Sequence, residues 1–196
     1  MRAHLLVVAS LLGCSGGPST ALSSEDGPSS SSSGQVGAAT AQAIFTGRFE
    51  DPDAGACSDA GALAEVGAFG EPSAAVPSTP APNGSTWSGK LVSVTCAVRE
   101  VADEKYDVSA ALRVGDDQTV RIEGRLEGTG DSKDVRVVVE RPTGAWEDRT
   151  CVARLTEPNM GVASGRAWAE IRCPKLEQGE ATCALTAQVR LENCTH

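Results

Sequence analysis

Apolar and polar residues alternate along most of the chain from Trp87 onward, and this alternation predicts β-strands. In residues 92–98, for example, three valines and Cys96 alternate with Ser, Thr and Ala. A period of two sends successive side chains to opposite faces, so each such segment buries one face and exposes the other. The segments with this pattern are 92–98, 106–114, 120–126, 135–139, 151–155, 166–173 and 183–191.

Turn-forming residues separate these segments, for instance at 115–117, 128–131 and 142–144, and we find no convincing helical period. Short strands with one polar face are typical of antiparallel sheets that close into a sandwich or a barrel. We therefore predict an all-β fold, an antiparallel β-sandwich or barrel of about seven strands. Roughly 110–150 ordered residues leave room for a single core.

Residues 43–49 form one further candidate strand, because Phe45, Gly47 and Phe49 would share a face. A Pro-, Gly- and Ser-rich stretch at 67–86 separates it from the regular pattern, and loops of this length are uncommon inside compact domains. We expect a single β domain over 41–196 with a long Pro-rich loop at 67–86. Whether 41–66 belongs to its core stays open at this point.

A basic start and a short apolar run, which ends at Cys14, open the chain. This order is that of a secretory signal peptide, here residues 1–13. The run spans about ten residues, whereas a membrane-spanning helix needs roughly 20. No other stretch is long and apolar enough to span a membrane.

The four residues Leu11-Leu12-Gly13-Cys14 resemble the lipobox of bacterial lipoproteins. The resemblance covers the first 14 residues. It implies that Cys14 becomes the N-terminus and carries acyl chains such as palmitate, which hold the protein to a membrane. Ser15 implies sorting to the outer membrane of a Gram-negative cell envelope. An ordinary signal peptide with an incidental cysteine is the alternative.

Residues 15–40 contain nine serines and no apolar period. Such a segment cannot bury enough surface to offset its ordering entropy. We interpret residues 14–40 as the lipidated N-terminus and a flexible, disordered tether, which would span about 25–30 Å.

The charge balance is acidic and argues against nucleic acid as a partner. The chain has 17 Lys+Arg and 26 Asp+Glu; without Arg2, which leaves with the signal peptide, the formal charge is −10. An acidic surface repels both phosphate backbones and anionic lipid head groups. The expected attachment to the membrane is therefore through the lipid.

Six cysteines remain once Cys14 is assigned to the lipid, and in an exported domain an even number indicates disulfides. They are Cys57, Cys96, Cys151, Cys173, Cys183 and Cys194. Fifteen pairings are possible, and a Cys173–Cys183 bridge across the last hairpin connection looks geometrically easy. No C-x-x-C pair exists and the only histidine after the signal peptide is His196, so we expect no zinc or other metal.

The shortage of histidine also removes the usual proton shuttle of hydrolytic triads, and we expect no enzymatic activity and no cofactor. Asp51, Asp53 and Asp59 suggest a calcium loop at first sight. An EF-hand would need a ligand at the place of Gly55 and a glycine at the place of Ala56, so an ordinary acidic turn fits better.

The predicted strand 166–173 carries Arg166, Trp168 and Arg172 on one face. They form either an exposed aromatic and basic patch or, more simply, side chains that cover the rim of the core. The ending of the chain resembles the C-terminal part of uncharacterised, cysteine-containing lipoproteins of high-GC Gram-negative bacteria. The residues that carry this likeness are Trp168, Cys173, Pro174, Cys183, Glu192, Asn193 and Cys194. It implies an envelope protein and supplies no catalytic residue.

These observations favour a lipid-anchored, non-enzymatic binding or structural module of the cell envelope, whose partner is another envelope protein or a polysaccharide. One alternative is a carboxylate-dependent hydrolase acting on envelope polysaccharide, which needs two suitably placed acids. Another is an inhibitor of secreted hydrolases, which would present a rigid exposed loop.

Overall fold

Strands make up most of the described chain, and it contains no helix. The computed structural model describes residues 39–196 except 54, 72–76 and 157. The predicted signal peptide, Cys14 and nearly all of the predicted tether lie outside the described residues. Within them, no helix exists that is long and apolar enough to cross a membrane.

The described strands fall into a short N-terminal group and a long regular series. The N-terminal group contains one strand of nine residues followed by three strands of two to four residues. The strands are β1 (Gln42–Glu50), β2 (Leu63–Val66), β3 (Ala81–Pro82), β4 (Thr86–Trp87), β5 (Lys90–Ala102), β6 (Lys105–Val114), β7 (Gln118–Glu127), β8 (Asp131–Arg141), β9 (Gly144–Arg154), β10 (Gly161–Ala163), β11 (Arg166–Gln178) and β12 (Ala181–Glu192).

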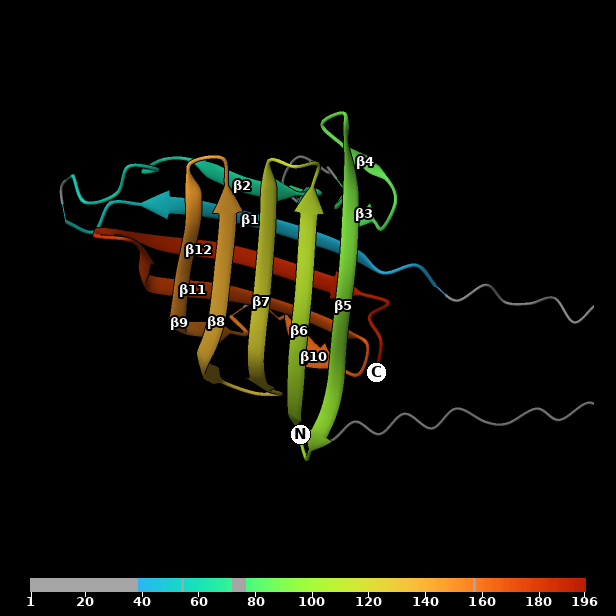
Figure 1. Cartoon of the computed structure of the whole chain (residues 1–196). Coiled ribbons are helices and arrows are strands. Elements are labelled where there is room, and N and C mark those ends of the chain that lie inside the picture. The colour runs from blue at the N-terminus through green and yellow to red at the C-terminus, as the bar shows by residue number, and fades with distance from the viewer. Residues whose placement is uncertain (1–38, 54, 72–76, 157) are drawn as a thin grey trace, which may run out of the picture. The chain divides into compact units, whose positions relative to one another are not determined.

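All twelve strands belong to one sheet, in the order β2-β1-β12-β11-β9-β8-β7-β6-β5-β4, with β10 beside β11 and β3 beside β1. Every pairing between named strands is antiparallel. The sheet bends back on itself, so β5 to β9 form one layer and β1, β2, β11 and β12 cross behind it at a steep angle (Figure 1). The result is an antiparallel sheet that is nearly closed into a barrel.

The C-terminal segment connects the two layers on the β5 side. Thr195 pairs with Ala97 of β5 in an isolated parallel bridge, and the amide of Val98 donates to the Thr195 carbonyl at 2.9 Å. Gly165, in the turn before β11, also donates to the Val98 carbonyl at 2.9 Å. These bonds satisfy backbone groups that an open edge would leave unpaired.

The core lies between the two layers, and side chains fill it. Phe45 and Phe49 of β1 and Trp146 of β9 are fully buried, and the rings of Phe49 and Trp146 lie 6.0 Å apart in a tilted arrangement. Most other core residues are valines, alanines and leucines. The all-β prediction is confirmed, and all seven strands expected after Trp87 are present.

The structure differs from the expectation in the number and length of the strands. Residues 41–66 belong to the core, because β1 lies between β2 and β12. The stretch 67–86, which we expected to be a loop throughout, contains the short strand β3 and the first residue of β4. The strand expected to end at Cys173 continues through Pro174 to Gln178. It does so because a register shift between Cys173 and Leu176 removes the need for a ladder hydrogen bond at the proline.

The six cysteines form three disulfides: Cys57–Cys183, Cys96–Cys194 and Cys151–Cys173. The expected Cys173–Cys183 bridge is therefore wrong. The same register shift places Cys183 opposite Leu176 and Cys173 opposite Leu185, so the two cysteines do not face each other. Cys173 instead reaches β9, and Cys183 reaches the loop that follows β1.

Candidate functional site

The outer face of the β6–β9 layer carries ion pairs between neighbouring strands. Arg125 donates to Asp107 at 2.8 Å, and Arg136 donates to Glu123 and to Glu147, both at 2.9 Å. The two carboxylates hold the pKa of the Arg136 guanidinium above its ordinary value, mainly through the hydrogen bond to Glu147. These charges are matched within the protein, so this face offers little for an outside partner to neutralise.

The outer face of the β1–β12–β11 layer is different, because part of it is covered. Ile44 of β1 points outward, opposite to the core-facing Ala43 and Phe45, and yet it is fully buried. Its register partner on β12 is Arg190, whose partner on β11 is Trp168. A buried apolar residue on an outer face requires a covering segment.

The segment after β2 provides this cover and turns at Gly67. The φ angle of Gly67 is +68°, and a Cβ there would lie 2.8 Å from the Thr79 carbonyl oxygen and 3.0 Å from that of Ala43. Only glycine tolerates such a close approach to two backbone oxygens. Ala68 and Thr79 then exchange hydrogen bonds at 2.9 and 2.8 Å, which hold the backbone in place directly before Phe69.

Phe69 is thereby stacked on Trp168. The ring centroids lie 6.1 Å apart with an interplanar angle of 20°. The guanidinium of Arg190 lies 5.4 Å from the Trp168 ring centroid, which is a cation–π contact. We call these three residues the aromatic stack. It half-buries Trp168 and fixes the indole ring on the sheet surface.

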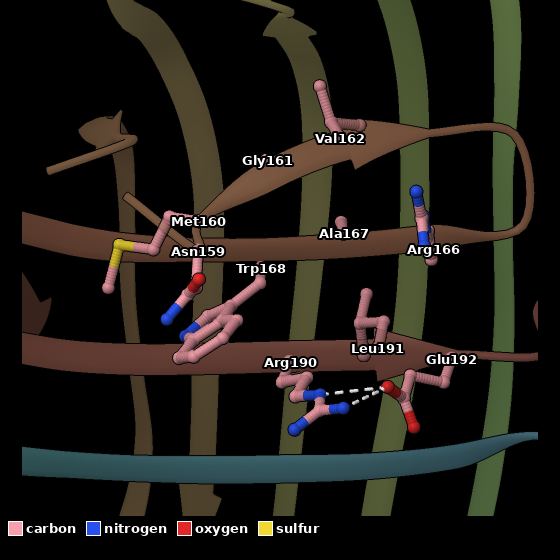
Figure 2. A pocket seen from close by; sticks show the side chains of 10 residues that line it. All are labelled: Asn159, Met160, Gly161, Val162, Arg166, Ala167, Trp168, Arg190, Leu191 and Glu192. Carbon is pink, nitrogen blue, oxygen red and sulfur yellow. Dashed lines mark hydrogen bonds and ion pairs between the residues drawn. The ribbon is translucent and has the colours of Figure 1, made fainter. Parts of the chain in front are cut away.

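Two hollows lie along β11 and β12 on either side of the aromatic stack. The first, the Trp168 pocket, has a volume of about 340 Å³ (Figure 2). It is lined by Asn159, Met160, Gly161, Val162, Arg166, Ala167, Trp168, Arg190, Leu191 and Glu192. The second, the Phe69 cleft, has a volume of about 360 Å³. It is lined by Thr46, Glu65, Gly67, Ala68, Phe69, Trp87, Glu170, Thr186, Ala187 and Gln188.

The two hollows follow one another along the same strands and so form a groove. The Trp168 pocket is lined by residues 166–168 of β11 and 190–192 of β12. The Phe69 cleft is lined by Glu170 of β11 and residues 186–188 of β12. Each volume lies in the range of small-molecule sites, about 300–1,000 Å³. We call the pair the outer groove.

Polar side chains cross the floor of the Phe69 cleft in one row. Register pairs Glu65 with Thr46, Thr46 with Gln188, and Gln188 with Glu170 across four neighbouring strands. The carboxylate of Glu170 accepts a hydrogen bond from Arg172 at 2.5 Å. The cleft therefore combines two aromatic side chains, Phe69 and Trp87, with two hydroxyls, an amide and two carboxylates.

The predicted patch of Arg166, Trp168 and Arg172 is only partly assembled. Trp168 lines the Trp168 pocket together with Arg166, whereas Arg172 is exposed and paired with Glu170. Trp168 does not cover the core rim but lies on the outer face of the layer. Phe69 was missed as a partner because the sequence places it in a Pro-rich stretch, 99 residues away from Trp168.

The acidic segment after β1 is not gathered around a common point. The Asp51 carboxylate accepts hydrogen bonds from the amides of Gly55 at 2.5 Å and Asp53 at 3.3 Å. The first of these lowers the pKa of Asp51 most. Asp59 instead points into the fold, where it accepts a bond from Trp146 Nε1 at 3.1 Å. The hydrogen bonds to Asp51 form the local turn expected from the sequence, whereas Asp59 bonds to Trp146 inside the fold.

One cluster has the composition of a metal site, namely Asp148, Cys151 and Cys173, whose ligand atoms lie within 4.8 Å of one another. The two sulfurs are joined to each other in a disulfide. The Asp148 carboxylate accepts bonds from Thr150 N at 2.7 Å and from Lys175 N at 3.1 Å. These contacts connect β9 to β11, so we assign the cluster to strand pairing.

No family model, curated protein or solved structure matches the chain. The class defined by its own features is an all-β, disulfide-stapled, nearly closed barrel with an aromatic groove on the outside of one layer. Assignment of function therefore rests on the groove and on the sequence.

Proposed function

We propose that this chain is a lipid-anchored, non-enzymatic protein of the bacterial cell envelope that binds polysaccharide in the outer groove. The N-terminal signal, the resemblance to a lipobox at Cys14 and the three disulfides support an envelope protein. The aromatic stack, with polar side chains on both sides of it, is the observation that supports the ligand class.

A sugar ring has one face made of C–H groups and a rim of hydroxyls. The C–H face packs on an aromatic ring, while hydroxyls bond to amide, hydroxyl and carboxylate groups that lie beside that ring. The Phe69 cleft provides both, since Phe69 and Trp87 line it together with Gln188. The groove is also elongated along the strands, as a linear chain of sugar units requires.

Co-sedimentation of the mature chain with peptidoglycan sacculi, chitin and cellulose tests this function. We expect the chain to sediment with at least one of them, and the Phe69→Ala variant to stay in the supernatant because it loses one of the two rings of the aromatic stack. Val101→Ala is the control, since it removes an exposed apolar side chain at the far end of β5. Failure to sediment with all three, or sedimentation that Phe69→Ala leaves intact, contradicts the proposal.

Mass spectrometry of the protein made in a Gram-negative host tests the anchor. We expect an N-terminal Cys14 with acyl chains and no free thiol among the other six cysteines. A mature protein that begins elsewhere without lipid would refute anchoring while leaving sugar binding in place.

Two glutamates in one cleft favour a second candidate, a polysaccharide hydrolase. Glu65 and Glu170 both line the Phe69 cleft, but three strand spacings separate their backbones, about 14 Å. Glycosidases hold their two carboxyl groups roughly 5–10 Å apart. Release of new reducing ends from any of the three polysaccharides, lost in Glu65→Gln and kept in the exposed control Glu100→Gln, would establish this candidate instead.

A further inference from the structure

The Trp168 pocket contains a buried hydrogen-bond donor that the described protein does not satisfy. The Nε1–H group of Trp168 is shielded from solvent and has no acceptor among the described residues. A buried N–H group without an acceptor costs free energy, and such groups therefore tend to have a partner in the functional state. A ligand that pairs with this donor must bring an acceptor such as a carbonyl oxygen.

The surroundings of this donor are an amide and an apolar side chain. Asn159 and Met160 line the same pocket as Trp168. In Figure 2 the Asn159 side chain lies on the side of the indole ring that carries its nitrogen. Asn159 provides a second donor and an acceptor, whereas Met160, whose sulfur already accepts a bond from Thr156 Oγ1 at 3.5 Å, provides nonpolar contact through its methyl group.

Two of the three charged side chains that line the pocket are paired with each other. Arg190 donates to Glu192 at 2.5 Å, and Glu192 also accepts a bond from Gln42 at 2.5 Å. The Arg166 side chain extends away from the indole ring (Figure 2). Glu192 already neutralises Arg190, the cation nearer to the indole ring, so a carboxylate or phosphate at Trp168 Nε1 would have no unpaired cation beside it. The pocket thus favours an uncharged acceptor.

We propose that the Trp168 pocket takes the acetamido group of a 2-acetamido sugar unit in the bound polysaccharide. This inference rests on the proposed function and names its ligand more closely. Binding uncovers Trp168 Nε1–H, which then donates to the acetyl carbonyl oxygen. Asn159 accepts the amide N–H, and Met160 contacts the methyl group. The adjoining aromatic stack carries the neighbouring sugar ring.

Calorimetric titration with two neutral tetrasaccharides of the same β-1,4 linkage tests the inference. One is the tetramer of N-acetylglucosamine and the other the tetramer of glucose, which has a hydroxyl in place of each acetamido group. We expect the mature wild-type chain to bind the acetylated tetramer about tenfold more tightly, since a site with a buried donor discriminates against a ligand that leaves it unpaired.

The Trp168→Phe variant isolates the donor because it keeps an aromatic ring and deletes Nε1–H. We expect the ratio of the two affinities to fall to about twofold or less, because the smaller ring weakens stacking for both tetramers together, whereas loss of Nε1–H weakens the acetylated tetramer alone. Phe69→Ala should weaken both tetramers together, and Val101→Ala neither. Far-UV and near-UV circular dichroism checks that each variant is folded.

The outcomes separate the inference from the proposed function. Equal affinity of the wild type for both tetramers, or a preference that survives in Trp168→Phe, overturns the acetamido assignment and leaves polysaccharide binding standing. No binding of either tetramer, together with no sedimentation on any of the three insoluble polysaccharides, overturns both.

Discussion

At the scale of single residues, Asp59 is the polar group on which the end of the core near Trp146 depends. Its carboxylate is 8% exposed and accepts bonds from Thr143 Oγ1 at 3.0 Å, Trp146 Nε1 at 3.1 Å and Arg141 at 3.4 Å. Arg141 also lies 5.6 Å from the centroid of the Phe49 ring. One carboxylate thus joins the loop after β1 to the β8–β9 hairpin.

Asp59→Ala should lower the free energy of unfolding by about 2–4 kcal/mol, because it leaves the Trp146 donor and the Arg141 charge without their shared acceptor. Urea denaturation followed by tryptophan fluorescence measures the change. The exposed Asp53→Ala is the matched control and should stay within about 0.5 kcal/mol of the wild type. Equal stability of the two variants would show that Asp59 is not the structural link we describe.

The ion pairs of Glu147 lead us to predict that the stability of the fold depends on pH. Hydrogen bonds from Arg136 and, next, Arg149 lower the pKa of its carboxyl below the ordinary value of glutamate. Because the folded pKa lies below the unfolded one, the pairing stabilises the fold above the unfolded pKa and is lost as the pH falls through the folded pKa. NMR titration of the Glu147 carboxyl should show the lowered pKa, and Arg136→Gln should raise it. A pKa that does not respond to Arg136→Gln contradicts the assignment.

At the scale of elements, the segment that begins at Gly67 determines whether the aromatic stack forms. Gly67→Ala should destabilise the fold by roughly 1–3 kcal/mol, since the added Cβ combines a positive φ with contacts to two backbone oxygens. It should also weaken co-sedimentation, because Phe69 loses its position over Trp168.

The Gly130→Ala variant separates the effect of a positive φ angle from the effect of contacts with backbone oxygens. The φ angle of Gly130 is +79°, but nothing lies within 4 Å of a Cβ there. We therefore expect a smaller loss of stability, roughly 1 kcal/mol, and unchanged co-sedimentation. If Gly67→Ala binds polysaccharide as well as Gly130→Ala does, the covering segment is not part of the site.

The strands themselves were largely predictable, because alternation marks a half-buried sheet directly. The strand ends were not. Pro174 stands inside β11 only because the register shifts there, and no local pattern announces such a shift. The same shift decides which residues Cys173 and Cys183 face, so the disulfide pairing could not be read from spacing within the last hairpin.

The site was less predictable than the fold. Trp168 stands out in the sequence as a large aromatic residue on a polar face, and it is in the groove. Glu65 comes from residues 41–66, whose membership of the core was open, and Phe69 comes from the stretch 67–86, which we expected to be a loop. Their approach to β11 depends on β1 entering the sheet beside β12, a contact between residues some 140 positions apart.

At the scale of the whole molecule, the two outer faces have different roles. The β6–β9 face pairs its own charges, as in Arg136 with Glu123 and Glu147. The β11–β12 face keeps an aromatic stack with hollows on both sides of it. With the interior filled by residues such as Trp146 and Phe45, the outer groove is where we place binding.

The most direct test of that placement is a map of amide and indole chemical shifts. It uses the ¹⁵N-labelled mature chain titrated with the N-acetylglucosamine tetramer. We predict that the shifts concentrate at the Trp168 indole, at Phe69 and along residues 186–192. Shifts that concentrate on β6–β9 or at the C-terminal segment, or their absence at millimolar ligand, would contradict the outer groove as the polysaccharide site.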